Sequence, residues 1–170
     1  MEEKKPILPP IIYRRLEGCY PPFREQVIKF LLAAHMKGLY VYVVQGYRSF
    51  KRQDQYYAKG RRGISGEKIV TKAKGGQSYH NYGVAIDLAF DEDLIKEGVQ
   101  WSWDKNLPWD SLGALGEAFG LGWGGNWPGF KGDLGHFHRT YGFTVKQLKE
   151  FYDAGGLKNV WKELDKAREE

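Results

Sequence analysis

The chain has 170 residues, with 26 Lys and Arg against 21 Asp and Glu, which gives a formal net charge of +5. Its single cysteine, Cys19, excludes an internal disulfide and a cysteine-rich zinc finger, its 42% hydrophobic content argues against disorder, and its apolar runs fall short of the ~20 residues of a membrane helix. The positive charge points to an anionic partner, such as nucleic acid, a membrane surface or an acidic cell-wall polymer.

The first elements expected along the chain are an arm, a helix, a strand and a second helix. Residues 1–22 are punctuated by prolines and are predicted to form an extended arm that packs on the domain. Residues 23–38 place apolar side chains at helical spacing and end in a glycine, which predicts a helix. Residues 39–46 are rich in β-branched and aromatic side chains, as in a buried strand. Residues 49–60 begin with a serine cap and should form the second helix.

A loop rich in Gly, Lys and Ser follows at 61–78, with one short strand expected around Ile69–Val70. Residues 83–90 (GVAIDLAF) predict a second buried strand. The next helix is opened by Pro108 and shows an apolar face that includes Leu112.

The last elements are a short strand near 136–138 and two short helices within 144–170, separated by Gly155 and Gly156. Helices interrupted by strands without regular βαβ alternation indicate an α+β domain. We expect the C-terminal helices to be amphipathic and docked on that domain.

Two compact motifs carry the candidate chemistry. In SYHNYGVAIDLAF, His80 precedes a strand that contains Asp87, and GDLGHFHRT contains Asp133, His136 and His138. Two imidazoles and a carboxylate suit a catalytic zinc site, in which three protein ligands leave one position open. A zinc ion lowers the pKa of its bound water to about 7, and a nearby carboxylate can move the proton. The residue types alone leave a structural role for these side chains open, because an HExxH motif is absent.

The pattern S-x-H-x-x-G-x-A-x-D followed by D-x-x-H resembles the zinc peptidases that cut peptidoglycan stem peptides. This group contains D-Ala-D-Ala carboxypeptidases and dipeptidases, and the L-alanyl-D-glutamate endopeptidases of bacteriophage endolysins. The upstream block GYRSFKRQDQYYAKG also resembles the corresponding block of this group, and the similarity spans roughly residues 25–140.

The resemblance implies a single α+β domain with a small antiparallel sheet flanked by helices, like the D-Ala-D-Ala peptidases and Hedgehog domains. It also implies Zn²⁺ as cofactor. The residues carried over by position are His80, Asp87 and His136 as zinc ligands, Asp133 as general base, Arg48 at the scissile carbonyl or its oxyanion, and Ser78 beside the substrate. Gln55 and Tyr82 match less defined positions and are possible contacts.

One departure from the family pattern concerns the last ligand. Gly135 stands where the family commonly has proline, and His138 follows His136 by two residues. Both imidazoles would point to the same face of a strand, so geometry alone does not choose between them. The three-residue interval from Asp133 favours His136, which leaves His138 beside the ligands or on the substrate side.

Two tryptophans precede the second motif in a glycine-rich stretch. Trp123 and Trp127 either pack in the core and loops or form a wall of the substrate groove, where glycines let the backbone approach a peptide. Both are candidate substrate contacts.

The favoured function is a zinc endopeptidase acting on bacterial peptidoglycan, with the L-Ala–D-Glu bond as its target. Residues 1–15 lack the pattern of a secretory signal, so we expect a phage-type endolysin held in the host cytoplasm until lysis. The alternatives are a D-Ala-D-Ala carboxypeptidase or dipeptidase with the same metal centre, and a non-catalytic wall-binding module.

The expected organisation is an N-terminal arm (1–22), a zinc peptidase domain (23–143) and a C-terminal helical segment (144–170) packed on that domain. We expect a monomer that binds peptidoglycan, does not bind nucleic acid and does not insert into a membrane. The charge alone suggests nucleic acid, and the sequence contains no signature of a nucleic-acid-binding fold.

Overall fold

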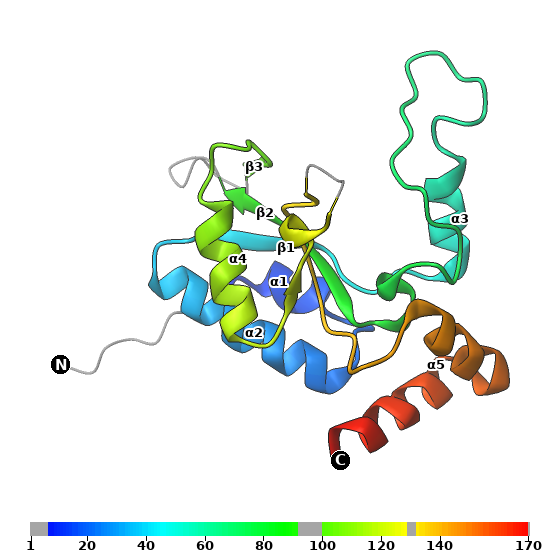
Figure 1. Ribbon diagram of the computed structural model, residues 1–170. Helices are drawn as coiled ribbons and strands as arrows, with labels where there is room; N and C mark the ends of the chain where they lie inside the picture. Colours follow the sequence, from blue (N-terminus) through cyan, green and yellow to red (C-terminus); the bar gives the residue numbers. More distant parts are fainter. Residues whose placement is uncertain (1–6, 92–99, 129–131, 170) are drawn as a thin grey trace.

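A small antiparallel sheet forms the centre of the computed structural model, which describes residues 7–91, 100–128 and 132–169 (Figure 1). Its strands run in the order β1-β2-β5-β4, and β3 also pairs with β2. The strands are β1 (Val41–Gln45), β2 (Ala85–Asp91), β3 (Trp101–Ser102), β4 (Gly122–Trp123) and β5 (His136–His138). Helices surround this sheet, which confirms the predicted α+β class.

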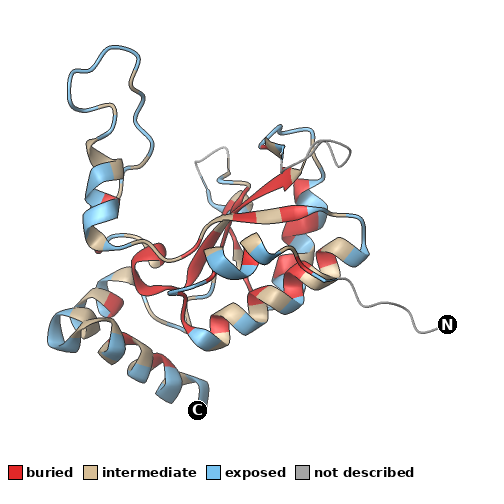
Figure 2. Cartoon of the chain, turned by 180° about the vertical axis from the view of Figure 1, so that it is seen from behind, coloured by how far each residue is buried: buried red, intermediate tan, exposed pale blue. Residues whose placement is uncertain are grey.

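Helices α2 (Pro21–Met36) and α4 (Trp109–Ala118) supply much of the core. The apolar side chains that predicted α2 are all buried: Phe23, Val27, Phe30, Leu31 and Ala34. Figure 2 shows the buried residues concentrated on the sheet and on the helix sides that face it. Burial of this apolar stripe, rather than helix propensity, stabilises α2 in the folded chain.

The N-terminal arm is not extended as predicted. Residues 1–6 lie outside the described residues, but α1 (Pro10–Arg15) is a short helix, and Leu8, Ile12 and Leu16 are buried in the core. A proline in the first turn is compatible with a helix because its missing N–H has no partner there anyway. The prolines therefore initiate a helix here instead of keeping the chain extended.

The predicted strand at Ile69–Val70 is also wrong. Both residues are described, lie outside the sheet and are more than half exposed, at 57% and 58%. They belong to the long loop after α3 (Phe50–Ala58), which projects from the body of the molecule (Figure 1). A β-branched pair gives a strand only where another strand is available to pair with it.

Helix α5 (Val145–Glu169) is broken at Gly155 and Gly156, as the sequence predicted. Gly156 has a φ of 71°, in the left-handed region that glycine tolerates. The second half of α5 contacts η1 (Tyr79–Tyr82), where the Trp161 indole donates a hydrogen bond to the Tyr82 carbonyl at 3.0 Å. Among the described residues, the structure contains no helix of the length and hydrophobicity needed to cross a bilayer.

The packing of α4 yields a stability prediction. A Cβ on Gly113 would lie 2.3 Å from the Trp123 ring, whose indole is buried. Gly113→Ala gains about 1 kcal/mol of helix propensity, but overpacking costs about 1–3 kcal/mol. We therefore expect a net loss of stability in urea unfolding. Ser111→Ala, exposed on the same helix, is the control and should stay within about 0.5 kcal/mol of the parent; a more stable Gly113→Ala would contradict the described packing.

Candidate metal centre

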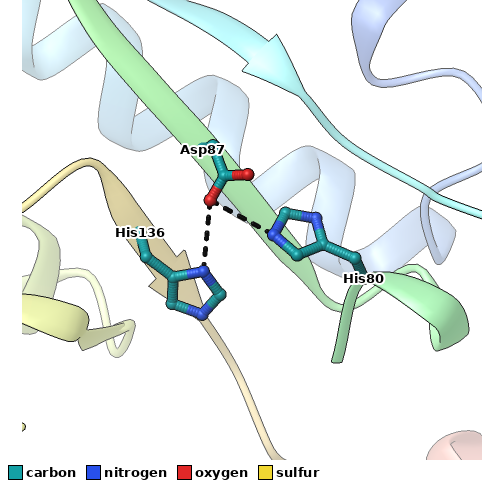
Figure 3. Close-up of side chains that lie close together, drawn as sticks. All are labelled: His80, Asp87 and His136. Carbon is teal, nitrogen blue, oxygen red and sulfur yellow. Dashed lines mark hydrogen bonds and ion pairs between the residues drawn. The ribbon is translucent and has the colours of Figure 1, made fainter. Parts of the chain in front are cut away.

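Three elements bring His80, Asp87 and His136 together, as Figure 3 shows. His80 lies in η1, Asp87 in β2 and His136 in β5. Oδ1 of Asp87 lies 3.2 Å from Nε2 of His80 and 3.2 Å from Nδ1 of His136. The three donor atoms all lie within 4.8 Å of one another, and this is the one such cluster found among the described residues.

A short 3₁₀ turn places His80. The Ser78 hydroxyl accepts a hydrogen bond from the His80 N–H at 3.3 Å, and the Asn81 side chain accepts from the Gly76 and Ser78 N–H groups. Gly83 ends the turn with a φ of 74°, and a Cβ there would meet the Tyr20 nitrogen at 2.9 Å. These contacts satisfy the backbone groups of the turn and direct His80 toward β2.

Strand register places the other two residues. Asp87 is the direct partner of His136 across the antiparallel β2–β5 pair, so their side chains emerge on the same face. Gly135 is tightly enclosed beside them. Its carbonyl accepts from the Leu88 N–H at 2.8 Å, and an added Cβ would lie 2.5 Å from the Leu88 oxygen. The glycine at this departure from the family pattern thus allows a close approach of two backbones.

Hydrogen bonding identifies which nitrogen of His80 faces the site. Nδ1 lies 2.8 Å from the Gly46 carbonyl, which only accepts, so Nδ1 carries the proton. In the neutral ring, Nε2 then presents a lone pair to a carboxylate oxygen at 3.2 Å. Two acceptors at this distance need either a proton on the ring nitrogen or a metal ion between them. A histidine held by a backbone carbonyl through its second nitrogen is typical of metal ligands.

The donor set fits zinc. Two imidazole nitrogens and one carboxylate oxygen are the ligands of open catalytic zinc sites, and they line a cavity of about 630 Å³. Burial favours the neutral acid, but the imidazoles of His80 and His136 hold the pKa of Asp87 well below its usual range. Asp87 is therefore an anion at neutral pH, as a metal ligand must be.

Arg48 and Asp133, the predicted catalytic pair, both line this cavity. The Arg48 guanidinium donates to Oδ2 of Asp87 at 3.3 Å and to the Gln53 side chain at 2.9 Å. Desolvation in the cavity wall and the Asp87 carboxylate raise the pKa of Asp133, while the imidazoles and Arg48 oppose that rise. A raised pKa is the direction required of a carboxylate that exchanges protons near neutral pH.

The structure separates the four predicted substrate contacts into two groups. Ser78 and Trp127 line the cavity, and the Trp127 ring lies 4.8 Å from that of His136. His138 stacks on Tyr79 at 5.1 Å, and burial followed by the nearby imidazoles lowers its pKa to about 4. Trp123 does not line this cavity. Its indole is buried in the core and donates to the Leu134 carbonyl at 2.9 Å, a structural role in place of the predicted contact.

Sequence reasoning missed the residue that holds Arg48. Gln53 is fully buried, accepts from Arg48 and donates to the Ala73 carbonyl at 2.8 Å. Gln55, the glutamine singled out from the sequence, lies on the exposed side of α3, and Tyr82 is buried with its hydroxyl on the Gly76 carbonyl. The sequence offers no local signal for this choice, because both glutamines lie in the helix predicted for residues 49–60 and only the tertiary contact with Arg48 distinguishes them.

Two imidazoles, a carboxylate between them and a second carboxylate in the same cavity define the chemistry of a mononuclear metallohydrolase. The model of the D-alanyl-D-alanine carboxypeptidase (VanY) family matches residues 20–124. The chain belongs to this family and is a metallopeptidase, as predicted. Arg48, His80 and Asp87 lie within the matched residues.

Relatives of known function support this membership. Over 119 residues the chain is 38% identical to the peptidoglycan L-alanyl-D-glutamate endopeptidase CwlK of Bacillus subtilis, covering 66% of this chain and 68% of the relative. The solved Serratia marcescens L-Ala D-Glu endopeptidase ChiX is 24% identical, with a TM-score of 0.51 over 81% of this chain and 92% of that one.

Two VanY structures share the fold at lower identity. VanYB in complex with D-alanine-D-alanine is 18% identical, with a TM-score of 0.52 over 83% of this chain and 81% of that one. The VanY D,D-pentapeptidase of a VanB-type resistance cassette, in complex with Zn(II), is 19% identical, with a TM-score of 0.52 over 82% of this chain and 81% of that one. These likenesses confirm the fold, and the predicted cofactor, zinc, fits both the donor set and the family.

Zinc titration distinguishes the two histidines of β5. His136→Ala removes a donor atom that converges on Asp87, so we expect its zinc affinity to fall by a factor of about 100 or more. His138→Ala, the matched control two residues away, should bind one zinc per chain with near-parental affinity. Calorimetric titration of the metal-free proteins measures both. Equal losses in the two variants would contradict the assignment of His136.

Proposed function

We propose that the chain is a zinc-dependent endopeptidase that hydrolyses the L-Ala–D-Glu bond of bacterial peptidoglycan stem peptides. The observation that carries this proposal is a His₂Asp centre and a second carboxylate in one open cavity, in a chain 38% identical to an enzyme with that activity. Peptidoglycan is the substrate class, zinc the cofactor, and the monomer the acting species.

The residues of the cavity have distinct parts in this reaction. His80, Asp87 and His136 would hold the zinc ion, which supplies a Lewis acid for the scissile carbonyl and an acidified water. Asp133 accepts the proton of the attacking water and delivers it to the leaving amine, because it is the carboxylate of this cavity that does not belong to the metal-binding cluster. Arg48 orients Asp87 through Oδ2 and adds positive charge where the oxyanion develops.

The cavity wall then positions the peptide. Ser78 caps η1 and borders the cavity, so a bound peptide would lie against the turn that carries His80. Trp127 is 39% exposed and packs beside His136, which makes it a flat apolar surface for a substrate side chain or backbone. Holding the reacting atoms at a fixed distance is a large part of what such contacts contribute.

A D-Ala-D-Ala carboxypeptidase is the second candidate, favoured by the family model that matches residues 20–124. The same metal centre can hydrolyse either bond. Which bond is cut depends on the substrate groups that the cavity binds on each side of the metal. A carboxypeptidase needs a cation for the terminal carboxylate of its substrate, and Lys59 and Lys72 line the cavity.

Mass spectrometry of digested peptidoglycan sacculi tests the proposal. We expect fragments with a new D-Glu amino terminus, their loss on chelation, and recovery with added zinc. Asp133→Asn should keep its zinc but release fragments about 100 to 10,000 times more slowly, since it lacks the proton acceptor. Free D-Ala as the sole product would instead establish the carboxypeptidase.

We further propose an endolysin role, in which the enzyme is stored in the cytoplasm of the bacterial host until the membrane is breached. This rests on the motif-level resemblance to the enzymes of bacteriophages. Cells that accumulate the protein should stay intact until the membrane is permeabilised, and turbidity should then fall within minutes. Cells expressing Asp133→Asn serve as the control, and lysis without permeabilisation would contradict storage.

A further inference from the structure

The positive charge of the chain is concentrated in one segment. Residues 59–74, the basic loop, contain six basic residues and one acidic residue, so their net charge equals the +5 of the whole chain. The basic residues, all exposed, are Lys59, Arg61, Arg62, Lys68, Lys72 and Lys74. Figure 1 shows this loop projecting beyond α3, and in Figure 2 most of it has the pale blue of exposed residues.

Contacts within the basic loop give it a defined shape. The Arg61 guanidinium lies 3.9 Å from the centroid of the Tyr57 ring and donates to the Thr71 carbonyl at 3.1 Å. Glu67, its one acidic residue, pairs with Arg62 and accepts from the Gly60 N–H at 3.0 Å. The two sides of the loop are thereby joined to each other and to α3, so its lysines are presented from an organised surface.

The base of this loop, where its first and last residues lie, forms part of the wall of the catalytic cavity. Lys59, Thr71 and Lys72 line the same cavity as the metal centre. The Lys59 ammonium lies 5.3 Å from the centroid of the Tyr56 ring, and Arg48 lies 4.8 Å from that centroid. Arg48 is itself paired with Asp87. Lysines from the basic loop therefore add positive charge to the cavity wall. The Tyr56 ring contacts both Lys59 and Arg48, the residue that orients the metal ligand Asp87.

We propose that Lys59 and Lys72 bind the free carboxylate of the stem peptide beside the scissile bond, and so select non-amidated stem peptides. This inference rests on the proposed function. In a stem peptide joined through the γ-carboxyl of D-Glu, the α-carboxylate is free and is carried by the Cα that is bonded to the scissile nitrogen. Amidation replaces this anion by a neutral carboxamide, which lysine ammonium groups hold less strongly.

Two peptides that differ only at this group test the inference. One is N-acetylated L-Ala-γ-D-Glu-L-Lys-D-Ala, and the other is the same peptide with the α-carboxylate of its D-Glu converted to a carboxamide. We expect the parental enzyme to cleave the carboxylate peptide with a kcat/KM about fivefold higher, the scale of exposed ion pairs. In the double variant Lys59→Gln/Lys72→Gln the ratio should fall to about one, through a higher KM for the carboxylate peptide. Both residues are exposed, so the fold is retained, which a melting curve verifies.

Lys68→Gln is the control, because it removes one lysine charge from the same loop at a position outside the cavity lining. It should keep the parental ratio. A ratio near one in the parental enzyme, a ratio retained in the double variant, or an equal loss in Lys68→Gln would each overturn the inference, while cleavage at L-Ala–D-Glu would leave the proposed function in place. Failure to cut either peptide would overturn both.

A different use of the loop has its own signature. If the double variant lost binding only to walls that carry teichoic acid, with an unchanged peptide ratio, the loop would be a docking surface for a wall polymer and the carboxylate assignment would be wrong. Sedimentation with walls before and after removal of teichoic acid makes that comparison.

Discussion

The organisation of this protein depends on one carboxylate oxygen that two imidazole nitrogens approach at 3.2 Å each. Such a contact is costly without a cation, because desolvated acceptors repel. The surrounding structure makes it persist: the Gly46 carbonyl fixes the His80 tautomer, and Arg48 neutralises the outer oxygen of Asp87. Nε2 of His136 is buried without a hydrogen-bond partner in the described part of the chain. The free-energy cost of holding these groups together lowers the stability of the metal-free fold, and metal binding offsets that cost.

The elements that support this contact are far apart in sequence. Trp161, in α5, donates to the Tyr82 carbonyl, and the Tyr82 hydroxyl donates to the Gly76 carbonyl at 2.7 Å. The 3₁₀ turn that carries His80 is thus held at its C-terminal end by the C-terminal helix. The segment 144–170, predicted from the sequence only as a docked helical pair, therefore bears on the geometry of the site. Small shifts in such supporting contacts are transmitted because close-packed interiors deform little.

The sequence predicted the long elements and the cluster of His80, Asp87 and His136 better than the short elements. His80 and Asp87 could be predicted from the sequence because they lie in one motif, in which a short turn leads into a seven-residue strand. Strands β3 and β4 have two residues each, too few for a periodic pattern. The burial of Trp123 is set by two glycines, Gly113 and Gly125, on which its ring packs. Contacts of this kind are tertiary, and no local spacing reveals them.

The net positive charge of the chain is located in one segment. Taken as composition, +5 is compatible with any anionic partner. The fold places the whole excess in residues 59–74, and outside that segment basic and acidic residues are equal in number. At physiological ionic strength an exposed charge acts over only about 8 Å. An excess confined to one projecting loop therefore acts on groups that come close to that loop, and Lys59 and Lys72 bring part of it to the cavity. Under the proposed carboxylate recognition these two lysines belong to the substrate site, while the other four basic residues of the loop lie outside the cavity lining.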